Sequence, residues 1–194
     1  MKIAGVVLAA GQSLRFGGNK LLADLGGQAL VRRTVHNLMS VGLDEIFVVT
    51  GHEAANVSLA LAGTKVKFIL NPAYAQGLSS SLKEGVAAAA KFDAVLVCLG
   101  DMPLVSAIDY RRIIRAFNAT GIVVPTYDGQ RGNPVLWGSR YFGELQALTG
   151  DQGARALLDK YRDAIIEVEV SGPGIFLDAD TPEALAKIKS IANF

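Results

Sequence analysis

Residues 6–22 read Val6-Val7-Leu8-Ala9-Ala10-Gly11-Gln12-Ser13-Leu14-Arg15-Phe16-Gly17-Gly18-Asn19-Lys20-Leu21-Leu22. An apolar run long enough for one buried strand stops at Gly11, and a loop that carries Arg15 and Lys20 follows before the chain becomes apolar again. Glycines let the backbone turn and bring its N–H groups close to a ligand. Together with two cations they predict a phosphate cradle at the end of a central strand. An ordinary turn with solvated charges is the alternative.

Two familiar phosphate-binding motifs do not describe this loop. No glycine directly precedes Lys20, and Leu21 stands where the P-loop requires Ser or Thr. The dinucleotide fingerprint G-x-G-x-x-G is also absent. The loop therefore indicates a phosphate site of another kind.

The composition is that of an ordinary globular protein. A chain of 194 residues fits one domain, 1–194, and such a domain can bury about 70% of its unfolded surface. The hydrophobic content is 51% and the charged content 19%, both close to the average. A net charge of +1 gives no electrostatic footprint for nucleic acid or an anionic membrane, so we expect neither as a partner.

Cysteine and histidine offer little for a metal site. The single cysteine, Cys98, lies in the apolar run 94–99 and is predicted to be a core residue. The two histidines, His36 and His52, are far apart and neither has a second ligand at metal spacing. His36 falls opposite the apolar stripe of its predicted helix, which favours a surface position.

The first ten residues resemble a short signal peptide only superficially. Their charged region is the single Lys2, and cleavage would remove the strand that opens the phosphate loop. No apolar run reaches the length needed to span a bilayer. We therefore expect a cytoplasmic protein.

Apolar periodicity predicts alternating strands and helices through the first part of the chain. The predicted strands are Lys2–Ala9, Glu45–Thr50, Lys65–Leu70 and Asp93–Leu99, with a short extended piece at Leu21–Leu25. The predicted helices are one with the apolar face Val31, Val35, Leu38 and Met39, ended by Gly42, then Glu53–Leu61, Ser79–Ala90, and one capped by Ser106 with Asp109. This alternation predicts a parallel α/β sheet with helices on both faces.

The pattern changes after Gly121. The predicted strands Ile122–Thr126 and Asn133–Trp137 flank a hairpin-like turn at 127–132, which predicts a small antiparallel part. Beyond it we expect helices at Ser139–Leu148 and Asp151–Tyr161, extended pieces at Ala164–Val170 and Gly174–Leu177, and a final helix opened by Asp180-Thr181-Pro182-Glu183.

Asp101 is the strongest candidate residue after the loop. It lies just past the carboxyl end of a predicted strand, where open α/β sheets place their ligands. A carboxylate there suits Mg²⁺, which takes one or two carboxylates together with phosphate oxygens. A turn or helix cap is the alternative role of such an aspartate.

Asp178 and Asp180 form a second acidic pair, on either side of Ala179. Residues two apart on an extended segment point to the same side, so both could approach one metal ion. Asp180 has a structural alternative, because Asp180 or Thr181 can cap the helix that begins with Pro182.

Several polar loops are weaker candidates. Residues 77–81 join a strand exit to a helix, and their glycine and serines could bind a base or ribose or simply cap the helix. Residues 132–134 and 150–155 are further polar loops that could be turns and no more. Arg155 could pair with an anionic substrate or be solvated.

Taken together, these segments resemble the molybdenum cofactor cytidylyltransferases, relatives of the molybdopterin guanylyltransferases. The resemblance covers essentially the whole chain. The matching motifs are Leu8-Ala9-Ala10-Gly11-x-Ser13-x-Arg15-Phe16-Gly17-x-x-Lys20, Asn71-Pro72-x-Tyr74-x-x-Gly77-Leu78-Ser79-Ser80-Ser81, Leu99-Gly100-Asp101-Met102-Pro103, Arg131-Gly132-Asn133-Pro134, Gly150-Asp151-x-Gly153-Ala154-Arg155 and Asp178-x-Asp180-Thr181-Pro182-Glu183.

The resemblance implies a three-layer, Rossmann-like nucleotidyltransferase fold (GT-A-like) with a mostly parallel sheet, CTP as donor, Mg²⁺ (or Mn²⁺) as cofactor and molybdopterin carrying molybdenum as acceptor. The guanylyltransferase branch typically has Gly at the place of Ala10 and asparagines near Asp178 and Asp180, so this sequence resembles the cytidine-using branch. A molybdenum hydroxylase, or its maturation factor, is implied as a partner.

The family's pattern also implies roles for individual residues. Catalysis would rest on Arg15, Lys20 and Asp101, and metal binding on Asp101 with Asp178 or Asp180. The nucleotide would be bound by Leu8, Ala9, Ala10, Gly11, Ser13, Arg15, Lys20, Asn71, Gly77, Ser79, Ser80, Gly100 and Asp101. The acceptor would be bound by Met102, Pro103, Asn133, Pro134, Asp151, Gly153 and Arg155.

Four other functions compete with this hypothesis. A guanylyltransferase and a nucleotidyltransferase for a sugar or polyol phosphate share its chemistry. A nucleotide-binding module without catalysis would have no use for Lys20 and Asp101 at the α-phosphate. A nicotinamide-dependent oxidoreductase is disfavoured by the missing fingerprint and by the absence of an acidic ribose partner on the second strand.

Overall fold

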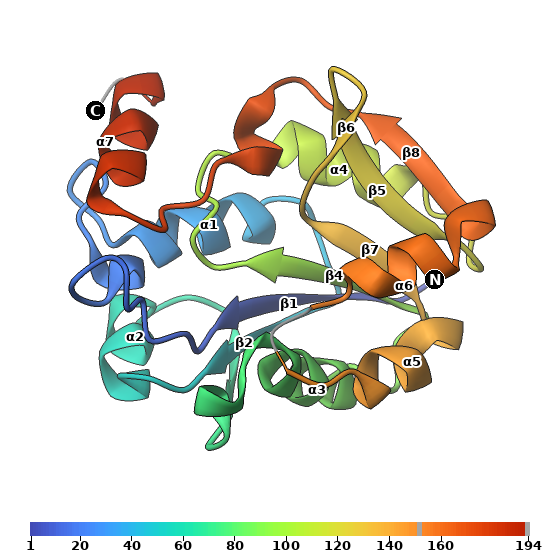
Figure 1. Ribbon diagram of the computed structural model, residues 1–194, viewed down its shortest axis with the longest axis horizontal. Helices are drawn as coiled ribbons and strands as arrows, with labels where there is room; N and C mark the ends of the chain where they lie inside the picture. The colour runs from blue at the N-terminus through green and yellow to red at the C-terminus, as the bar shows by residue number, and fades with distance from the viewer. Residues whose placement is uncertain (151–152, 193–194) are drawn as a thin grey trace.

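The computed structural model describes residues 1–150 and 153–192. Its centre is an eight-stranded mixed sheet in the order β3-β2-β1-β4-β7-β5-β6, with β8 paired to β5 (Figure 1). The strands are β1 (Ile3–Ala9), β2 (Glu45–Thr50), β3 (Lys67–Leu70), β4 (Ala94–Leu99), β5 (Ile122–Tyr127), β6 (Gln130–Arg131), β7 (Val135–Gly138) and β8 (Ile165–Glu169).

Strand β1 is central to the parallel part of the sheet. Every residue of β1 is buried, as expected for a strand covered on both faces. It pairs in parallel with β2 on one side and with β4 on the other, and Leu8 lies opposite Leu99. The loops that leave β1, β2 and β4 therefore start at one edge of the sheet.

The antiparallel part begins with β7, which runs between β4 and β5 in the direction opposite to both. Strands β5 and β6 form a hairpin closed by Asp128 and Gly129. Both residues have positive φ, 50° and 72°, as a two-residue type I′ turn requires. The prediction of a small antiparallel part in the C-terminal half is thus confirmed, whereas β8 pairs in parallel with β5.

Helices cover both faces of the sheet, so the architecture has three layers (Figure 1). One face packs against α1 (Leu30–Met39), α2 (Ala54–Ala60), α4 (Ala107–Arg115) and α7 (Pro182–Ile191). The other packs against α3 (Leu78–Ala88), α5 (Phe142–Ala147) and α6 (Arg155–Lys160). The predicted α/β class is therefore confirmed.

Two predicted extended pieces are wrong. Residues Lys20–Leu22 form a 3-10 helix, η1, where the sequence predicted the extended piece Leu21–Leu25. Residues Pro173–Phe176 form another, η5, in place of Gly174–Leu177. In both segments one apolar side chain, Leu21 or Ile175, is buried, and a single turn of helix buries it as well as a strand would.

Some helix bounds also differ from the prediction. Residues Ser139–Tyr141 form the 3-10 helix η3 before α5, where one helix over 139–148 was predicted. The helix predicted at 151–161 is described only over Arg155–Lys160, and its first two residues lie outside the described part. Thr181, rather than Asp180, caps α7 by accepting a hydrogen bond from the Ala184 N–H. Short helices depend on tertiary packing more than on their own sequence, so apolar spacing alone does not define their ends.

Other single-residue predictions are confirmed. Cys98 is 1% exposed, and burial raises the pKa of its thiol far above the ordinary value. His36 is exposed on α1, opposite its buried face. Within residues 1–150 and 153–192, no helix has the length and apolar character to cross a membrane.

Candidate functional site

A cavity of about 600 Å³ opens at the edge of the sheet where β1 and β4 end. Its walls come from the loop after β1, the turn after β4, the approach to α3 and the segment before α7. Among the predicted site residues, those that line it are Leu8, Ala9, Ala10, Gly11, Ser13, Arg15, Lys20, Gly77, Asp101, Asp178 and Asp180. The fold thus gathers residues that are up to 172 positions apart into one site (180 − 8 = 172).

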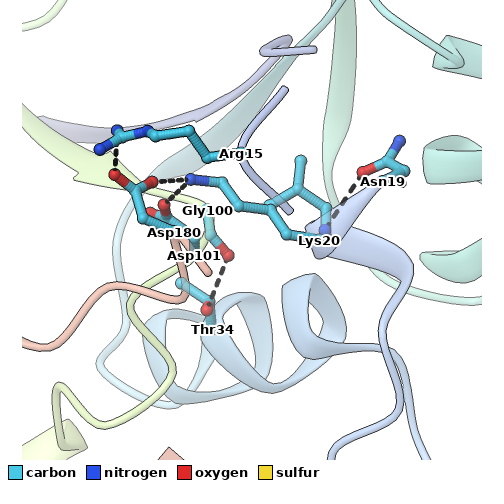
Figure 2. Close-up of polar contacts among 8 residues, drawn as sticks. Arg15, Asn19, Lys20, Thr34, Gly100, Asp101 and Asp180 are labelled. Atoms are coloured by element: carbon cyan, nitrogen blue, oxygen red, sulfur yellow. Dashed lines mark hydrogen bonds and ion pairs between the residues drawn. The ribbon is translucent and has the colours of Figure 1, made fainter. Parts of the chain in front are cut away.

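Four charged side chains form the polar centre of the cavity (Figure 2). The Lys20 ammonium donates hydrogen bonds to the carboxylates of Asp101 and Asp180. The Arg15 guanidinium donates to the other oxygen of Asp180. The Lys20 and Asp101 side chains are 16% and 11% exposed, whereas Arg15 is 75% exposed. The Lys20–Asp101 pair is therefore the buried part of the cluster, and Arg15 closes it at the surface.

Local structure fixes the position of Lys20. Asn19 precedes η1, and its side-chain oxygen accepts a hydrogen bond of 3.1 Å from the Leu21 N–H. The amide nitrogen of Asn19 donates to a carboxylate oxygen of Glu53 at 2.9 Å. Asn19 thus ties the start of η1 to the start of α2, and Lys20 is held next to both contacts.

Gly100 brings Asp101 close to β1. A Cβ atom at position 100 would lie 3.0 Å from the carbonyl oxygen of Leu8, a close contact that glycine avoids. The Gly100 N–H donates to that same carbonyl at 3.0 Å. The turn after β4 therefore begins in contact with β1, and Asp101 emerges beside the loop that carries Lys20.

Ser13 has an unusual conformation in the same loop. Its φ of 55° is in the left-handed region, which non-glycine residues rarely adopt. Its hydroxyl oxygen is buried and makes no hydrogen bond within the part of the chain that the structure describes. A buried polar atom without a partner is costly, so this hydroxyl favours a role in ligand contact.

The charges of the cluster shift the pKa values of its members. Burial alone would lower the pKa of Lys20, but the carboxylates of Asp101 and Asp180 outweigh it and raise that pKa above the usual value. Burial would raise the pKa of Asp180, but its hydrogen bond from Lys20 and the charges of Lys20 and Arg15 hold it below the usual range. At neutral pH Lys20 is therefore protonated and Asp180 is ionised, so their ion pair is formed.

Asp178 differs from its two acidic neighbours because, within the described residues, it forms no ion pair or hydrogen bond with a cation. Burial raises the pKa of its carboxyl, and the negative charges of Asp101 and Asp180 raise it further. Lys20 and Arg15 oppose this shift only in part. Three carboxylates thus share one cavity with two cations, which leaves an excess negative charge that a bound cation would neutralise.

We predict that Asp178→Asn stabilises the protein at neutral pH. A carboxyl with a raised pKa binds its proton more tightly in the folded state, so its ionisation costs stability once the pH exceeds the raised value. The amide removes that cost, and solvent screening keeps the gain in unfolding free energy to about 1 kcal/mol or less.

The gain should disappear as the pH falls below the ordinary aspartate range near 4, where the carboxyl is protonated in both states. Urea denaturation of both proteins between pH 3 and pH 8 measures it. Equal stability at pH 7, or a gain that grows toward pH 3, would contradict the assigned environment of Asp178.

The acidic residues fit a magnesium ion in the form that Mg²⁺ commonly takes. No group of three or more His, Cys, Asp and Glu side chains in residues 1–150 and 153–192 is arranged as a ready metal centre. Mg²⁺ needs no such centre, because it keeps several waters and takes one or two carboxylates plus phosphate oxygens of the substrate. Asp101 with Asp178 or Asp180 supplies such a set of hard oxygen ligands.

Four residues predicted to bind the nucleotide do not line the cavity: Asn71, Ser79, Ser80 and Gly100. The Asn71 amide nitrogen donates to the Ser80 hydroxyl at 2.9 Å, and its oxygen accepts from the Ala73 N–H. Ser80 also donates to backbone carbonyls of the same loop. Ser79 is 3% exposed, and its N–H donates to Gly150. These polar groups stabilise the loop before α3, and Gly77 rather than a serine is the N-cap of α3.

A second cavity of about 650 Å³ adjoins the first, because Leu8, Leu78 and Leu99 line both. Of the residues predicted to bind an acceptor, Asn133 and Arg155 line it. The others lie elsewhere: Met102 and Pro103 are buried in the turn after β4, Pro134 and Gly153 are buried beside the cavity wall, and Asp151 is outside the described residues.

Sequence reasoning missed several residues of the first cavity. Tyr74 and Ser81 line it, although the motif at 71–81 implied roles only for their neighbours. Thr34 of α1 does not line the cavity but was also missed, although its hydroxyl donates to the Gly100 carbonyl at 3.0 Å. A threonine inside an amphipathic helix gives no sequence signal of such a contact.

Comparison with known proteins places the chain and its fold in a known family. The MobA-like NTP transferase domain matches residues 5–165. Purine catabolism protein PucB of Bacillus subtilis is 30% identical over 193 residues, which cover 93% of both chains. The molybdenum cofactor cytidylyltransferase of Escherichia coli is 29% identical over 184 residues, or 92% of this chain and 91% of that protein.

Two further relatives extend the comparison. The bifunctional protein GlmU of Syntrophomonas wolfei is 26% identical over 166 residues, which cover 84% of this chain but only 35% of GlmU. Among solved structures, Rv0371c of Mycobacterium tuberculosis in complex with manganese superposes with a TM-score of 0.85 at 29% identity, over 98% of this chain and 99% of the other.

Proposed function

The chain belongs to the family of MobA-like NTP transferase domains, and from this premise we propose that it transfers CMP from CTP to the phosphate of molybdopterin carrying molybdenum. The products would be a cytosine dinucleotide cofactor and pyrophosphate. The observation that carries the proposal is the buried Lys20–Asp101 pair at the common edge of β1 and β4.

The reaction requires the protein to position the substrates and to neutralise their charge, but not to form a covalent bond with them. An oxygen of the acceptor phosphate, already anionic, forms a bond to the α-phosphorus of CTP. The bond from that phosphorus to the β-phosphate bridging oxygen breaks, and pyrophosphate leaves with its electron pair. No proton has to be removed from the nucleophile, so the site needs no general base.

The residues of the first cavity supply what this reaction needs. The backbone of Ala10 and Gly11 faces the cavity, where N–H groups can bind phosphate oxygens. Lys20 and Arg15 carry the positive charge that a triphosphate requires. Their present partners are carboxylates, and phosphate oxygens can replace these as hydrogen-bond acceptors.

The fit of the acidic residues supports a divalent cation as cofactor. Asp101, with Asp178 or Asp180, would hold Mg²⁺ or Mn²⁺, and a manganese complex is described for the relative Rv0371c. When bound, the ion would neutralise charge on the phosphate oxygens. Asp101 is best placed for this role because its side chain is fixed in the turn after β4 and only 11% exposed.

The second cavity is the proposed acceptor site. Its floor is apolar, with Leu82, Val97 and Trp137 among its residues, and its rim carries Arg131, Asn133 and Arg155. A flat ring system fits the apolar side chains, and the arginines can pair with an acceptor phosphate. Both features agree with molybdopterin as the acceptor.

The choice of CTP rests on Ala10. This residue lines the first cavity and is 3% exposed, and its methyl group stands where the guanylyltransferase branch typically has glycine. The resemblance to the cytidine-using branch, together with the 29% identical cytidylyltransferase, supports the same choice.

Pyrophosphate release tests this proposal. We expect it with CTP and Mg²⁺ only when purified molybdopterin carrying molybdenum is present, and much less with GTP, UTP or ATP. Glucosamine 1-phosphate and an acceptor-free reaction are the comparison arms, with Asp101→Asn as the inactive control protein. Preference for GTP would overturn the cytidine assignment, and activity with the sugar phosphate alone would overturn the acceptor.

A further inference from the structure

The turn after β4, residues 100–105, lies outside regular secondary structure although most of it is buried. Its carbonyl groups have no partners from a helix or strand ladder, and buried carbonyls need hydrogen bonds. Asp101 stands in this turn, so whatever holds the carbonyls also fixes the backbone that presents the Asp101 carboxylate to the cavity (Figure 2).

Helix α1 supplies two of the donors from one face. Thr34 and Asn37 are three residues apart, which places them next to each other along the helix surface. The Thr34 hydroxyl donates to the Gly100 carbonyl at 3.0 Å. The Asn37 amide nitrogen donates to the carbonyls of Pro103 at 3.1 Å and Val105 at 3.0 Å.

The third donor comes from the segment before α7. The Ala179 N–H donates to the carbonyl of Asp101 itself at 3.2 Å. Because Ala179 stands between Asp178 and Asp180, this bond also sets the position of those two carboxylates relative to Asp101. The turn is therefore held on one side by α1 and on the other by the second acidic segment.

The Thr34 hydroxyl has two carbonyl oxygens within hydrogen-bond distance, and the nearer one belongs to the turn after β4. The hydroxyl is 3.5 Å from the Leu30 carbonyl of its own helix, the usual acceptor for a threonine in a helix, but only 3.0 Å from Gly100. The side chain is completely buried. Its hydrogen bond is thus directed to the residue immediately before Asp101.

We infer that Thr34 and Asn37 are positioning residues, which fix the carboxylate of Asp101 for the metal ion. The inference rests on the proposed function, in which Asp101 binds that ion. Carboxylates that ligate a metal depend on the groups that hold them, and removal of such a group typically costs about 10–100-fold in metal affinity or activity.

The decisive variant is Thr34→Val, which keeps the shape of the side chain and removes only the hydroxyl. We expect it to weaken Mn²⁺ binding by about 10-fold, measured by electron paramagnetic resonance on the protein with CTP, and to lower kcat by about 10-fold. The KM for CTP should stay within about two-fold, because the triphosphate contacts of Lys20 and Arg15 are intact. Thr34→Ser should restore both quantities.

A matched control separates positioning from stability. Thr126 is also buried, and its hydroxyl donates to Glu169 at 2.9 Å, away from both cavities. Thr126→Val should therefore lower the melting temperature as Thr34→Val does, but leave Mn²⁺ binding unchanged. Asn37→Ala should act like Thr34→Val, with a smaller effect, because its acceptors lie two and four residues beyond Asp101.

Two results would overturn the inference. In the first, Thr34→Val binds Mn²⁺ like the unmodified protein and only its melting temperature falls, so the hydroxyl serves stability alone. In the second, Thr34→Ser fails to restore metal binding although it is folded. Because Mn²⁺ binding is measured without the acceptor, it tests the role of Thr34 even if the proposed acceptor proves wrong.

Discussion

Lys20→Ala is expected to lower turnover by about 10²–10³, the scale for loss of one preorganised charge that stabilises the transition state. Lys20 is the only cation of the cluster that is both buried and bound to two carboxylates among the described residues, with 16% of its side chain exposed. Charge–charge interactions are strong in such a place because little water screens them. Without the lysine, the charge that develops on the departing pyrophosphate would lose the most buried cation of the cluster.

Steady-state kinetics at saturating CTP measures this effect. Lys160→Ala is the matched control, because Lys160 also forms an ion pair, with Glu144, but on the surface and outside both cavities. We expect the control to retain normal turnover. If Lys20→Ala does so as well, Lys20 has no part in the chemical step.

Asp101→Asn is expected to have an effect at least as large, a loss of about 10³-fold or more in turnover. The amide keeps the size of the side chain and its contact with the turn, but it cannot neutralise a divalent cation. Activity should then respond only weakly to added Mg²⁺. Titration of Mg²⁺ with both proteins measures the loss together with its cause.

The control for Asp101 lies at the other end of β4. Asp93 precedes β4, at the opposite edge of the sheet, and its carboxylate accepts a hydrogen bond from the Lys2 N–H at 2.6 Å. Asp93→Asn changes the same charge far from the cavity and should leave turnover unchanged. An Asp101→Asn protein that still requires Mg²⁺ at the usual concentration would exclude Asp101 as a metal ligand.

The central strands could be predicted well because a continuous apolar run is typical of a strand that is buried on both faces. The bounds of β2, Glu45–Thr50, were predicted to the residue, and those of β1 and β4 each begin one residue later than predicted. These strands are buried on both faces, so their sequences are almost continuously apolar. Their carboxyl ends then located the site, since parallel strands bring their ends together.

Short segments could not be predicted in the same way. Leu21–Leu25 and Gly174–Leu177 each contain a few apolar residues, and such runs fit a strand or a turn of helix equally well. Tertiary contacts decide between the two. Next to η1 one such contact is the hydrogen bond from Asn19 to Glu53, between residues that are 34 positions apart.

For the polar groups of the site, the sequence identified the residues but not the contacts between them. The sequence indicated Lys20, Asp101 and Asp180 as separate candidates, but no pattern showed that one lysine would contact both carboxylates. Asn71 and Ser80 were both predicted to bind the nucleotide, yet in the fold they form a hydrogen bond with each other. Which polar side chain is used by the loop and which is left for a ligand depends on the folded geometry.

Transfer of label from CTP carrying ³²P at the α-phosphate tests the central claim most directly. With Mg²⁺ and molybdopterin carrying molybdenum, the label should move into a new dinucleotide, and unlabelled pyrophosphate should appear in equal amount. Asp101→Asn and Lys20→Ala should each suppress the transfer. Label that remains in CTP, while the folded protein binds both substrates, would contradict the assignment of this cavity to nucleotidyl transfer.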